Sequence, residues 1–211
     1  WGYGRYAQFG AASALYDQIP DTDFRKHSWL DPKRTEYYNY KFAGTEADRN
    51  DFLNGSQAAK SYVALKFRPA QGECNDFNIG NAGDYCLMRI EEMYFIEMEA
   101  KANLDLNEGI KLLKNFMKEY RNSQYDRSPA SWDDFKKEYM LQKRVEFWGE
   151  GIVFFDYKRL DVGINRAFAG SNHPSVFRLG ATDGRSPQWN IVVTRAEFQS
   201  NTAIDDKTNN P

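Results

Sequence analysis

Two glutamates in the second half of the chain have the residue type and spacing of a catalytic carboxylate pair. Glu146 and Glu150 stand at positions i and i+4, so on one continuous helix their Cβ atoms would lie about 6 Å apart on the same face. A glycoside hydrolase requires two carboxyl groups roughly 5 to 10 Å apart across a sugar ring. The spacing therefore raises the hypothesis that this pair cleaves glycans.

The neighbours of the pair favour a structural role instead. Arg144, Lys158 and Arg159 lie close to it in the sequence, and Gly149 and Gly151 interrupt the helical pattern there. Carboxylates at such a junction commonly hold two helix ends together through charge-assisted hydrogen bonds. We therefore interpret the pair as part of the scaffold and expect the chain to have no catalytic residue.

The other ionisable residues give no sign of catalysis. Arg89, Glu92 and Glu99 stand between apolar positions, where charges are costly unless they are paired, so an internal network of ion pairs is expected. His27 and His173 are the only histidines, and neither has a Ser, Cys or Asp nearby in a recognisable nucleophile motif. The sequence thus predicts neither a catalytic triad nor a metal site.

Cysteines and charge narrow the possibilities further. Cys74 and Cys86 fit no zinc-binding pattern, and the interpretations of two free thiols or of a disulfide both stay open. The formal net charge is −2 and no block of like charge runs along the chain, so nucleic acid is not the expected partner. The segment 87–104 carries too many charges to be a membrane-spanning helix. No cofactor is expected.

Aromatic residues are abundant and point to a binding surface. They make up 16% of the chain, more than a small helical core needs, so some rings are expected to stack on a ligand at the surface. The candidates are rings in loop-like or terminal contexts: Trp1, Tyr3, Tyr6, Trp29, Tyr37 and Tyr38. Sugar rings pack their C–H faces on flat aromatic surfaces, and we select Trp1, Tyr3 and Trp29 as the predicted ligand-binding residues.

The first part of the chain predicts short elements separated by loops. Residues 5–16 have apolar side chains at helical spacing, and Pro20 ends that helix in a turn over 19–25. Residues 61–67 alternate in polarity, which is the pattern of a half-buried strand. Residues 69–83 are rich in Gly and Asn and are expected to form a loop.

The second part predicts longer helices. A helix over 85–104, capped by Asp84, carries two apolar stripes, and a second amphipathic helix ends near Tyr120. The short link between them predicts an αα-hairpin of the tetratricopeptide type. Ser131 is the expected N-cap of a third helix, which ends where the glycines at 149 and 151 stand. Beyond 161 the chain is loop-like, with a short strand expected at 191–193.

Four segments of the chain resemble motifs of the SusD/RagB family. Residues 19–25 are similar to its Ile-Pro-x-x-Asp-x-Arg turn, and residues 89–100 resemble its Arg-x-x-Glu-(apolar)-Glu-Ala helix. Residues 143–159 are similar to its Arg-x-Glu-(apolar)-x-x-Glu-Gly stretch, followed by Asp-(apolar)-x-Arg. Residues 197–211 resemble its Glu-x-x-x-Asn ending with Asn-Pro. Val153 and Thr194 depart from the family pattern at positions where Arg and Pro are common.

The resemblance implies a fold and a function. The fold would be mainly α, with tetratricopeptide-type helix hairpins, a few short strands and long loops. Residues 1–211 would be the C-terminal part of a single SusD-like domain, without the N-terminal half that holds the lipidation site and most tetratricopeptide helices. The protein would be a surface-exposed lipoprotein of the outer membrane that binds oligosaccharide without cleaving it and delivers it to a TonB-dependent transporter.

Two other functions remain open from the sequence. One is a peptide- or protein-binding member of the same fold. The other is a glycoside hydrolase that uses Glu146 and Glu150.

Overall fold

The computed structural model describes residues 9–33, 61–67, 78, 84, 86–178, 183–186, 189–190 and 193–204. The chain divides into two compact units, Trp1–Trp148 and Gly149–Pro211, and each is described by itself. In the described ranges the regular structure is helical, and β-structure is confined to two isolated bridges. The mainly α class is thus confirmed.

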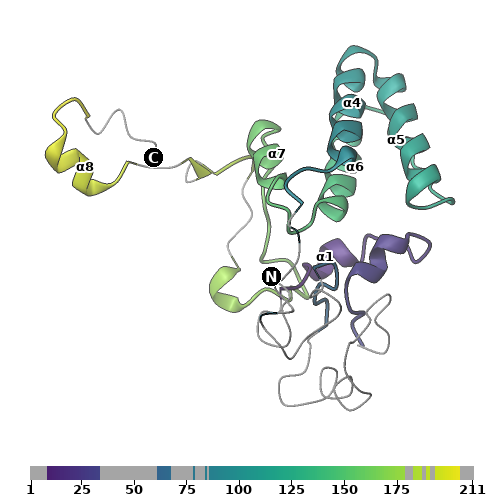
Figure 1. Ribbon diagram of the computed structural model, residues 1–211, viewed down its shortest axis with the longest axis horizontal. Helices are drawn as coiled ribbons and strands as arrows, with labels where there is room; N and C mark the ends of the chain where they lie inside the picture. Colours follow the sequence, from purple (N-terminus) through teal and green to yellow (C-terminus); the bar gives the residue numbers. More distant parts are fainter. Residues whose placement is uncertain are drawn as a thin grey trace. The chain divides into compact units, whose positions relative to one another are not determined.

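The helices fall in both units (Figure 1). The first unit contains α1 (Ser13–Tyr16), the 3-10 helix η1 (Phe24–Ser28), α4 (Ile90–Leu104), α5 (Leu106–Tyr120) and α6 (Trp132–Glu146). The second unit contains α7 (Val153–Arg159), the 3-10 helix η3 (Ser175–Phe177) and α8 (Arg195–Ser200).

Helices α4 and α5 form the predicted αα-hairpin and lie side by side in Figure 1. Asp105 alone separates them, and its side chain accepts a hydrogen bond from the backbone N–H of Asn107, which caps α5. The two helices touch where Gly109 faces Ala102. A Cβ atom on Gly109 would lie only 2.3 Å from the Cβ of Ala102, so the absence of a side chain there permits the close approach.

The predicted start of α4 is wrong by five residues. The helix begins at Ile90 with Arg89 as its N-cap, and not at 85 with Asp84. Arg89 has an extended backbone (φ −120°, ψ 150°), and its guanidinium group contacts Glu146 at the end of α6. The residue before Ile90 is therefore held by a tertiary contact that the helical periodicity of the sequence does not reveal.

Helix α4 is apolar on two opposite sides. Phe95, Met98 and Ala102 are buried, whereas Ile96 and Leu104 are 48% and 86% exposed. At about 100° per residue these two sets point in opposite directions. The expectation of two apolar stripes is confirmed. Helical spacing had grouped Met98 with Ile90 and Tyr94, and this grouping is wrong, since Met98 is buried with Phe95 and Ala102.

Helix α6 packs against the hairpin through aromatic rings. Phe95 of α4 lies at the centre, with ring centroids 5.6 Å from Phe116, 5.6 Å from Tyr139 and 5.4 Å from Phe147. Ser131 caps α6 as predicted, because its Oγ accepts a hydrogen bond from the backbone N–H of Asp134. The ring contacts of Phe95 with Tyr139 and Phe147 fix the position of the C-terminal end of α6.

The other face of α6 closes a second core. Leu141 and Val145 pack with residues of the first segment, namely Ala11, Leu15, Tyr16, Ile19 and Trp29. Val63 and Leu65 are buried as the predicted alternation requires. They form no regular strand: Val63 and Ala64 make only isolated bridges, and Tyr62 has a left-handed φ of 67°, which breaks the extended conformation.

Glycines separate α6 from α7, as expected. Gly149 and Gly151 have φ of 77° and 85°, a region that favours glycine because a Cβ atom would clash with the backbone. Within the second unit, Asp161 holds a distant segment, since its carboxylate accepts a hydrogen bond from the backbone N–H of Arg185 at 2.9 Å. Residues 191 and 192 of the predicted final strand, and most of 69–83, lie outside the described residues.

Candidate functional site

Glu146, the first member of the carboxylate pair, is bound by three arginines. It is the last residue of α6 and is 6% exposed. Its Oε2 accepts hydrogen bonds from Arg121 Nε at 2.8 Å and Arg25 Nη1 at 3.1 Å. Its Oε1 accepts from Arg121 Nη2 at 2.9 Å and Arg89 Nη1 at 3.2 Å. Each carboxylate oxygen therefore has two charged donors.

Two further carboxylates balance the arginines. Arg25 binds Asp23 through two nitrogens, with Nε–Oδ1 3.0 Å and Nη2–Oδ2 2.6 Å. Glu91 bridges the other two, at 3.1 Å from Arg121 Nη2 and 3.1 Å from Arg89 Nη1. We call these residues the Glu146 cluster: Asp23, Arg25, Arg89, Glu91, Arg121 and Glu146. It contains three guanidinium groups and three carboxylates, and its formal charge is zero.

The pKa of Glu146 reflects this environment. Burial by itself raises the pKa of a carboxyl group, because the charged form loses its hydration. The hydrogen bonds and charge of Arg121, with the charges of Arg25 and Arg89, outweigh burial and lower the pKa of Glu146 from 4.5 to about 2. The carboxylate is thus ionised at neutral pH and is a poor proton donor or acceptor there.

Cations also cap the C-terminus of α6. Lys66 Nζ donates to the backbone carbonyls of Glu146 at 2.7 Å and Trp148 at 3.3 Å. Arg89 Nη2 donates to the Glu146 carbonyl at 3.1 Å. The last carbonyls of a helix lack partners within it and carry partial negative charge. The cluster and these caps together join four segments of the first unit to one helix end.

The carboxylate pair does not have the geometry that its spacing implies. Helix α6 ends at Glu146, and Gly149 with φ of 77° stands between it and Glu150. The two residues therefore do not share a face of one continuous helix. The scaffold role is confirmed for Glu146, but its arginine partners are Arg25, Arg89 and Arg121 from distant segments and not the neighbours expected from the sequence.

Trp29, one of the predicted ligand-binding residues, is in the core. It is 2% exposed, and its ring packs edge-to-face on Trp148 with centroids 5.9 Å apart. Its buried Nε1 has no hydrogen-bond partner among the described residues. A sugar stacked on Trp29 would need an exposed ring face, which this structure does not provide. Trp1 and Tyr3 lie outside the described residues, as do Tyr6, Tyr37 and Tyr38, and their roles stay predictions.

Comparison with known proteins identifies the family. The sequence model that describes the SusD family matches residues 7–207 of the chain. The chain belongs to the SusD family. Among solved structures, it is similar to a SusD-like carbohydrate binding protein from Bacteroides vulgatus ATCC 8482, with 23% identity and a TM-score of 0.61. The match covers 93% of this chain and 41% of that protein, so the chain spans about two fifths of its length. No curated protein matches the chain.

Three of the four motifs that resemble the SusD family supply residues of the Glu146 cluster. The turn at 19–25 supplies Asp23 and Arg25, the helix at 89–100 supplies Arg89 and Glu91, and the stretch at 143–159 supplies Glu146. These residues bind one another, and their hydrogen-bonding groups point into the cluster. The most specific sequence signature of this SusD-family chain thus encodes its scaffold.

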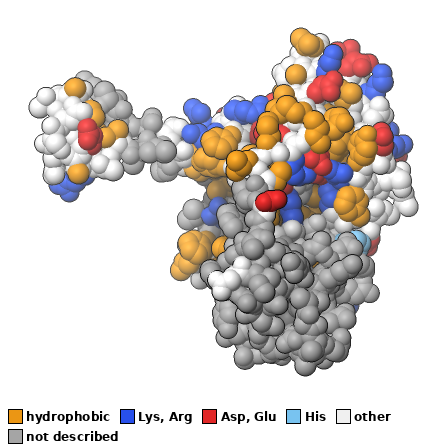
Figure 2. All heavy atoms as spheres, viewed as in Figure 1, with side chains coloured by type: hydrophobic (Ala, Val, Ile, Leu, Met, Phe, Trp, Pro, Cys, Tyr) orange, Lys and Arg blue, Asp and Glu red, His pale blue; other side chains and the backbone are white. Residues whose placement is uncertain are grey.

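Exposed rings that the sequence did not single out lie elsewhere. In the first unit Phe24, Tyr94 and Tyr120 are 53%, 40% and 44% exposed. In the second unit Phe154 and Phe155 of α7 are 46% and 66% exposed. Figure 2 shows apolar side chains among charged ones on the viewed surface of the first unit. Helical periodicity places Tyr94 and Tyr120 on apolar stripes, but it does not distinguish the edge of a buried stripe from its centre.

The structure adds three observations on metals, thiols and membranes. No group of His, Cys, Asp and Glu suited to a metal ion occurs among the residues that were described. Cys86 is a free, exposed thiol. Cys74, with which a disulfide was one of the two alternatives from the sequence, lies outside the described ranges. No described helix has the length and apolar character needed to cross a membrane.

Proposed function

We propose that the protein to which this chain belongs binds a neutral oligosaccharide without cleaving it and delivers it to a TonB-dependent outer-membrane transporter. The observation that carries this proposal is the SusD-family match over residues 7–207. The similar solved structure is itself named a SusD-like carbohydrate binding protein. We also propose a surface-exposed position on the outer membrane, held by a lipid anchor.

The environment of Glu146 supports binding without cleavage. A general acid for glycoside hydrolysis needs a raised pKa so that it holds a proton near neutral pH. The pKa of Glu146 is instead lowered to about 2, and both of its oxygens are occupied by arginine donors. The carboxylate that the sequence nominated as catalytic is therefore unsuited to that role.

Charge balance supports a neutral ligand. The formal net charge of the chain is −2, and the arginines of the Glu146 cluster are each paired with carboxylates. A polyanionic glycan would instead favour unpaired basic residues along its path. A neutral saccharide needs flat apolar surfaces with hydrogen-bonding groups at their edges.

Calorimetry combined with product analysis tests the proposal on the intact protein. We expect heat release with at least one member of a panel of glucan, xylan and mannan oligosaccharides, with a Kd in the micromolar to millimolar range, about −8 to −4 kcal/mol. Chromatography of the same mixtures after prolonged incubation should show unchanged oligosaccharides.

Three results would contradict the proposal. New, shorter products would establish a hydrolase. Binding of peptides without binding of any oligosaccharide would favour the peptide-binding alternative. Absence of heat with the whole panel, from protein that unfolds cooperatively, would remove neutral glycans as the ligand class.

A further inference from the structure

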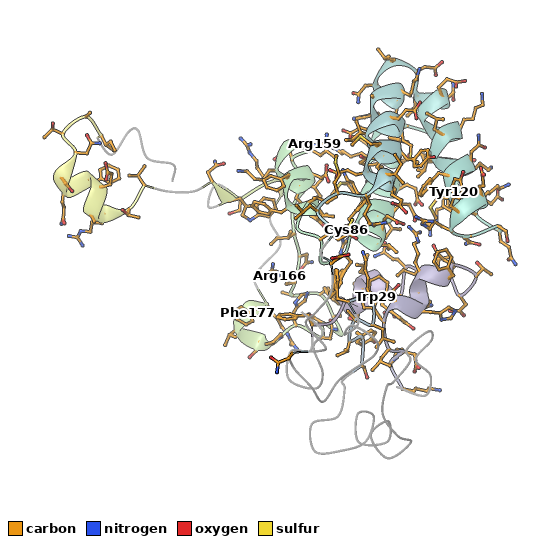
Figure 3. All side chains as sticks on the ribbon, viewed as in Figure 1. Trp29, Cys86, Tyr120, Arg159, Arg166 and Phe177 are labelled. Carbon is orange, nitrogen blue, oxygen red and sulfur yellow. The ribbon has the colours of Figure 1, made fainter. Side chains whose placement is uncertain are left out.

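Three exposed aromatic residues from separate elements surround Phe116 and Arg121 on the first unit. Phe24 comes from η1, Tyr94 from α4 and Tyr120 from α5. Tyr94 and Tyr120 have ring centroids 6.3 Å apart and an interplanar angle of 32°. Figure 3 labels Tyr120, whose side chain projects from α5. We call Phe24, Tyr94 and Tyr120 the aromatic strip.

A buried layer holds the strip in place. Phe116 is 5% exposed and its ring lies 5.5 Å from the rings of both Tyr94 and Tyr120. The guanidinium group of Arg121 lies 4.9 Å from the centre of the Phe116 ring and 5.8 Å from that of Phe24. Because Arg121 is itself held by Glu146, the exposed rings rest on an ordered layer, and little conformational freedom is left to lose on binding.

The chemistry of the strip suits an uncharged, hydroxyl-rich ligand. Arg121 is engaged by Glu146 and Glu91, so it presents no free charge. The neighbouring carboxylate of Glu119 raises the pKa of the Tyr120 hydroxyl. Tyrosine rings whose hydroxyl groups contact solvent are suited to surfaces that are apolar at the centre and polar at the rim. The hydroxyl groups and the Glu119 carboxylate can exchange hydrogen bonds with sugar hydroxyls.

The strip differs from the other exposed apolar surface of the unit. The outer side of α4 is aliphatic, with Met93, Ile96 and Leu104 exposed. Aliphatic faces of this kind pack against other helices. The strip has flat rings bordered by polar groups.

We propose that Phe24, Tyr94 and Tyr120 form a stacking surface for the rings of a neutral oligosaccharide. The inference rests on the proposed function and assigns a location for binding within this chain. The two tyrosines stack on neighbouring sugar rings, and Phe24 extends the surface toward η1. Phe24 and Tyr94 lie within two of the segments that resemble the family, whereas Tyr120 lies outside all four. None of the predicted ligand-binding residues Trp1, Tyr3 and Trp29 belongs to this surface.

Calorimetry of variants of the intact protein tests the assignment, with the oligosaccharide that gives the largest heat for the wild type as the probe. Tyr120→Ala and Tyr94→Ala should each raise its Kd about tenfold, which corresponds to about 1.4 kcal/mol. Tyr120→Phe keeps the ring and should retain most of the affinity. Phe177→Ala, which removes a ring that is 58% exposed in the second unit, serves as the control and should bind as the wild type does.

The outcomes separate this inference from the proposed function. If the wild type binds and both tyrosine-to-alanine variants bind equally well with unchanged melting temperatures, the strip is not the site, while the proposed function stands. If both variants lower the melting temperature sharply and Tyr120→Phe does so too, the strip is a packing surface and the inference is wrong. If the wild type binds no oligosaccharide, the proposed function fails and the inference with it.

Discussion

Removal of the negative charge from Glu146 should destabilise the protein severely. It should not change the absence of oligosaccharide cleavage that we propose for the wild type. In Glu146→Gln the side chain keeps its size, but its amide group turns donors toward arginines that are themselves donors. The cluster then holds three guanidinium groups against the two carboxylates of Asp23 and Glu91. A buried charge without its partner is costly, because neither water nor a counter-charge stabilises it.

Two independent arguments give similar magnitudes for this loss. Breaking a buried ion pair by removing one partner typically costs about 3 to 5 kcal/mol. The lowered pKa of Glu146, from 4.5 to about 2, corresponds to about 3 kcal/mol of interaction that favours the ionised form in the folded protein. We therefore expect Glu146→Gln to lower the free energy of unfolding by about 3 kcal/mol or more.

Urea-induced unfolding of the intact protein, followed by circular dichroism, measures the effect. Glu108→Gln is the matched control: it removes the same charge from the exposed ion pair of Glu108 with Lys111, and should change the free energy of unfolding by less than about 0.5 kcal/mol. If Glu146→Gln unfolds at the same urea concentration as the wild type, the cluster does not stabilise the fold as argued.

The same carboxylate predicts a pH dependence. Because its pKa is lower in the folded protein than in the unfolded chain, its contribution is fully present above pH 4.5. It is lost as the pH falls from 4.5 toward about 2. In this range the carboxyl group binds a proton in the unfolded chain but not in the folded protein, which favours unfolding. The difference in stability between wild type and Glu146→Gln should therefore shrink over this range, and a difference that stays constant would contradict the assigned pKa.

Further predictions follow from other contacts. Gly109→Ala should lower the free energy of unfolding by about 1 to 3 kcal/mol, measured by urea unfolding, since the added Cβ meets Ala102 at 2.3 Å. Ser131→Ala should cost about 1 kcal/mol in the same assay through loss of the α6 cap. The 211-residue chain alone should self-associate in sedimentation experiments through the exposed side of α4, and charged residues in place of Ile96 and Leu104 should reduce this. A monomeric chain that unfolds cooperatively would contradict the last prediction.

The sequence predicted helices and their ends well wherever local chemistry decides them. Ser131 caps α6, the glycines at 149 and 151 separate it from α7, and the short link makes α4 and α5 a hairpin. Each of these features depends on residues within a few positions. The start of α4 was missed because Arg89 is held in an extended conformation by Glu146, which is far away in the sequence.

The candidate site was predictable only in part, for a similar reason. A pattern of charges predicts that Glu146 needs partners, but it does not say which ones: Arg25, Arg89 and Arg121 arrive from three other segments. A tryptophan next to a turn is predicted to be exposed when only its neighbours in the sequence are considered, because the residues that cover it come from elsewhere in the chain. Trp29 is covered by Trp148 and the second core, so local context misplaced it.

The division between scaffold and ligand surface follows from what each requires. A buried ion-pair cluster works only if every member keeps its charge and position, so its residues carry a specific motif that can be read from the sequence. A stacking surface for neutral sugars requires only flat rings and nearby hydrogen-bonding groups, and many residues meet that need. Tyr94 and Tyr120 consequently look like ordinary helix residues in the sequence. In this chain the arginine motif identifies the family, whereas the rings that we propose to bind the ligand rest on the same cluster through Phe116 and Arg121.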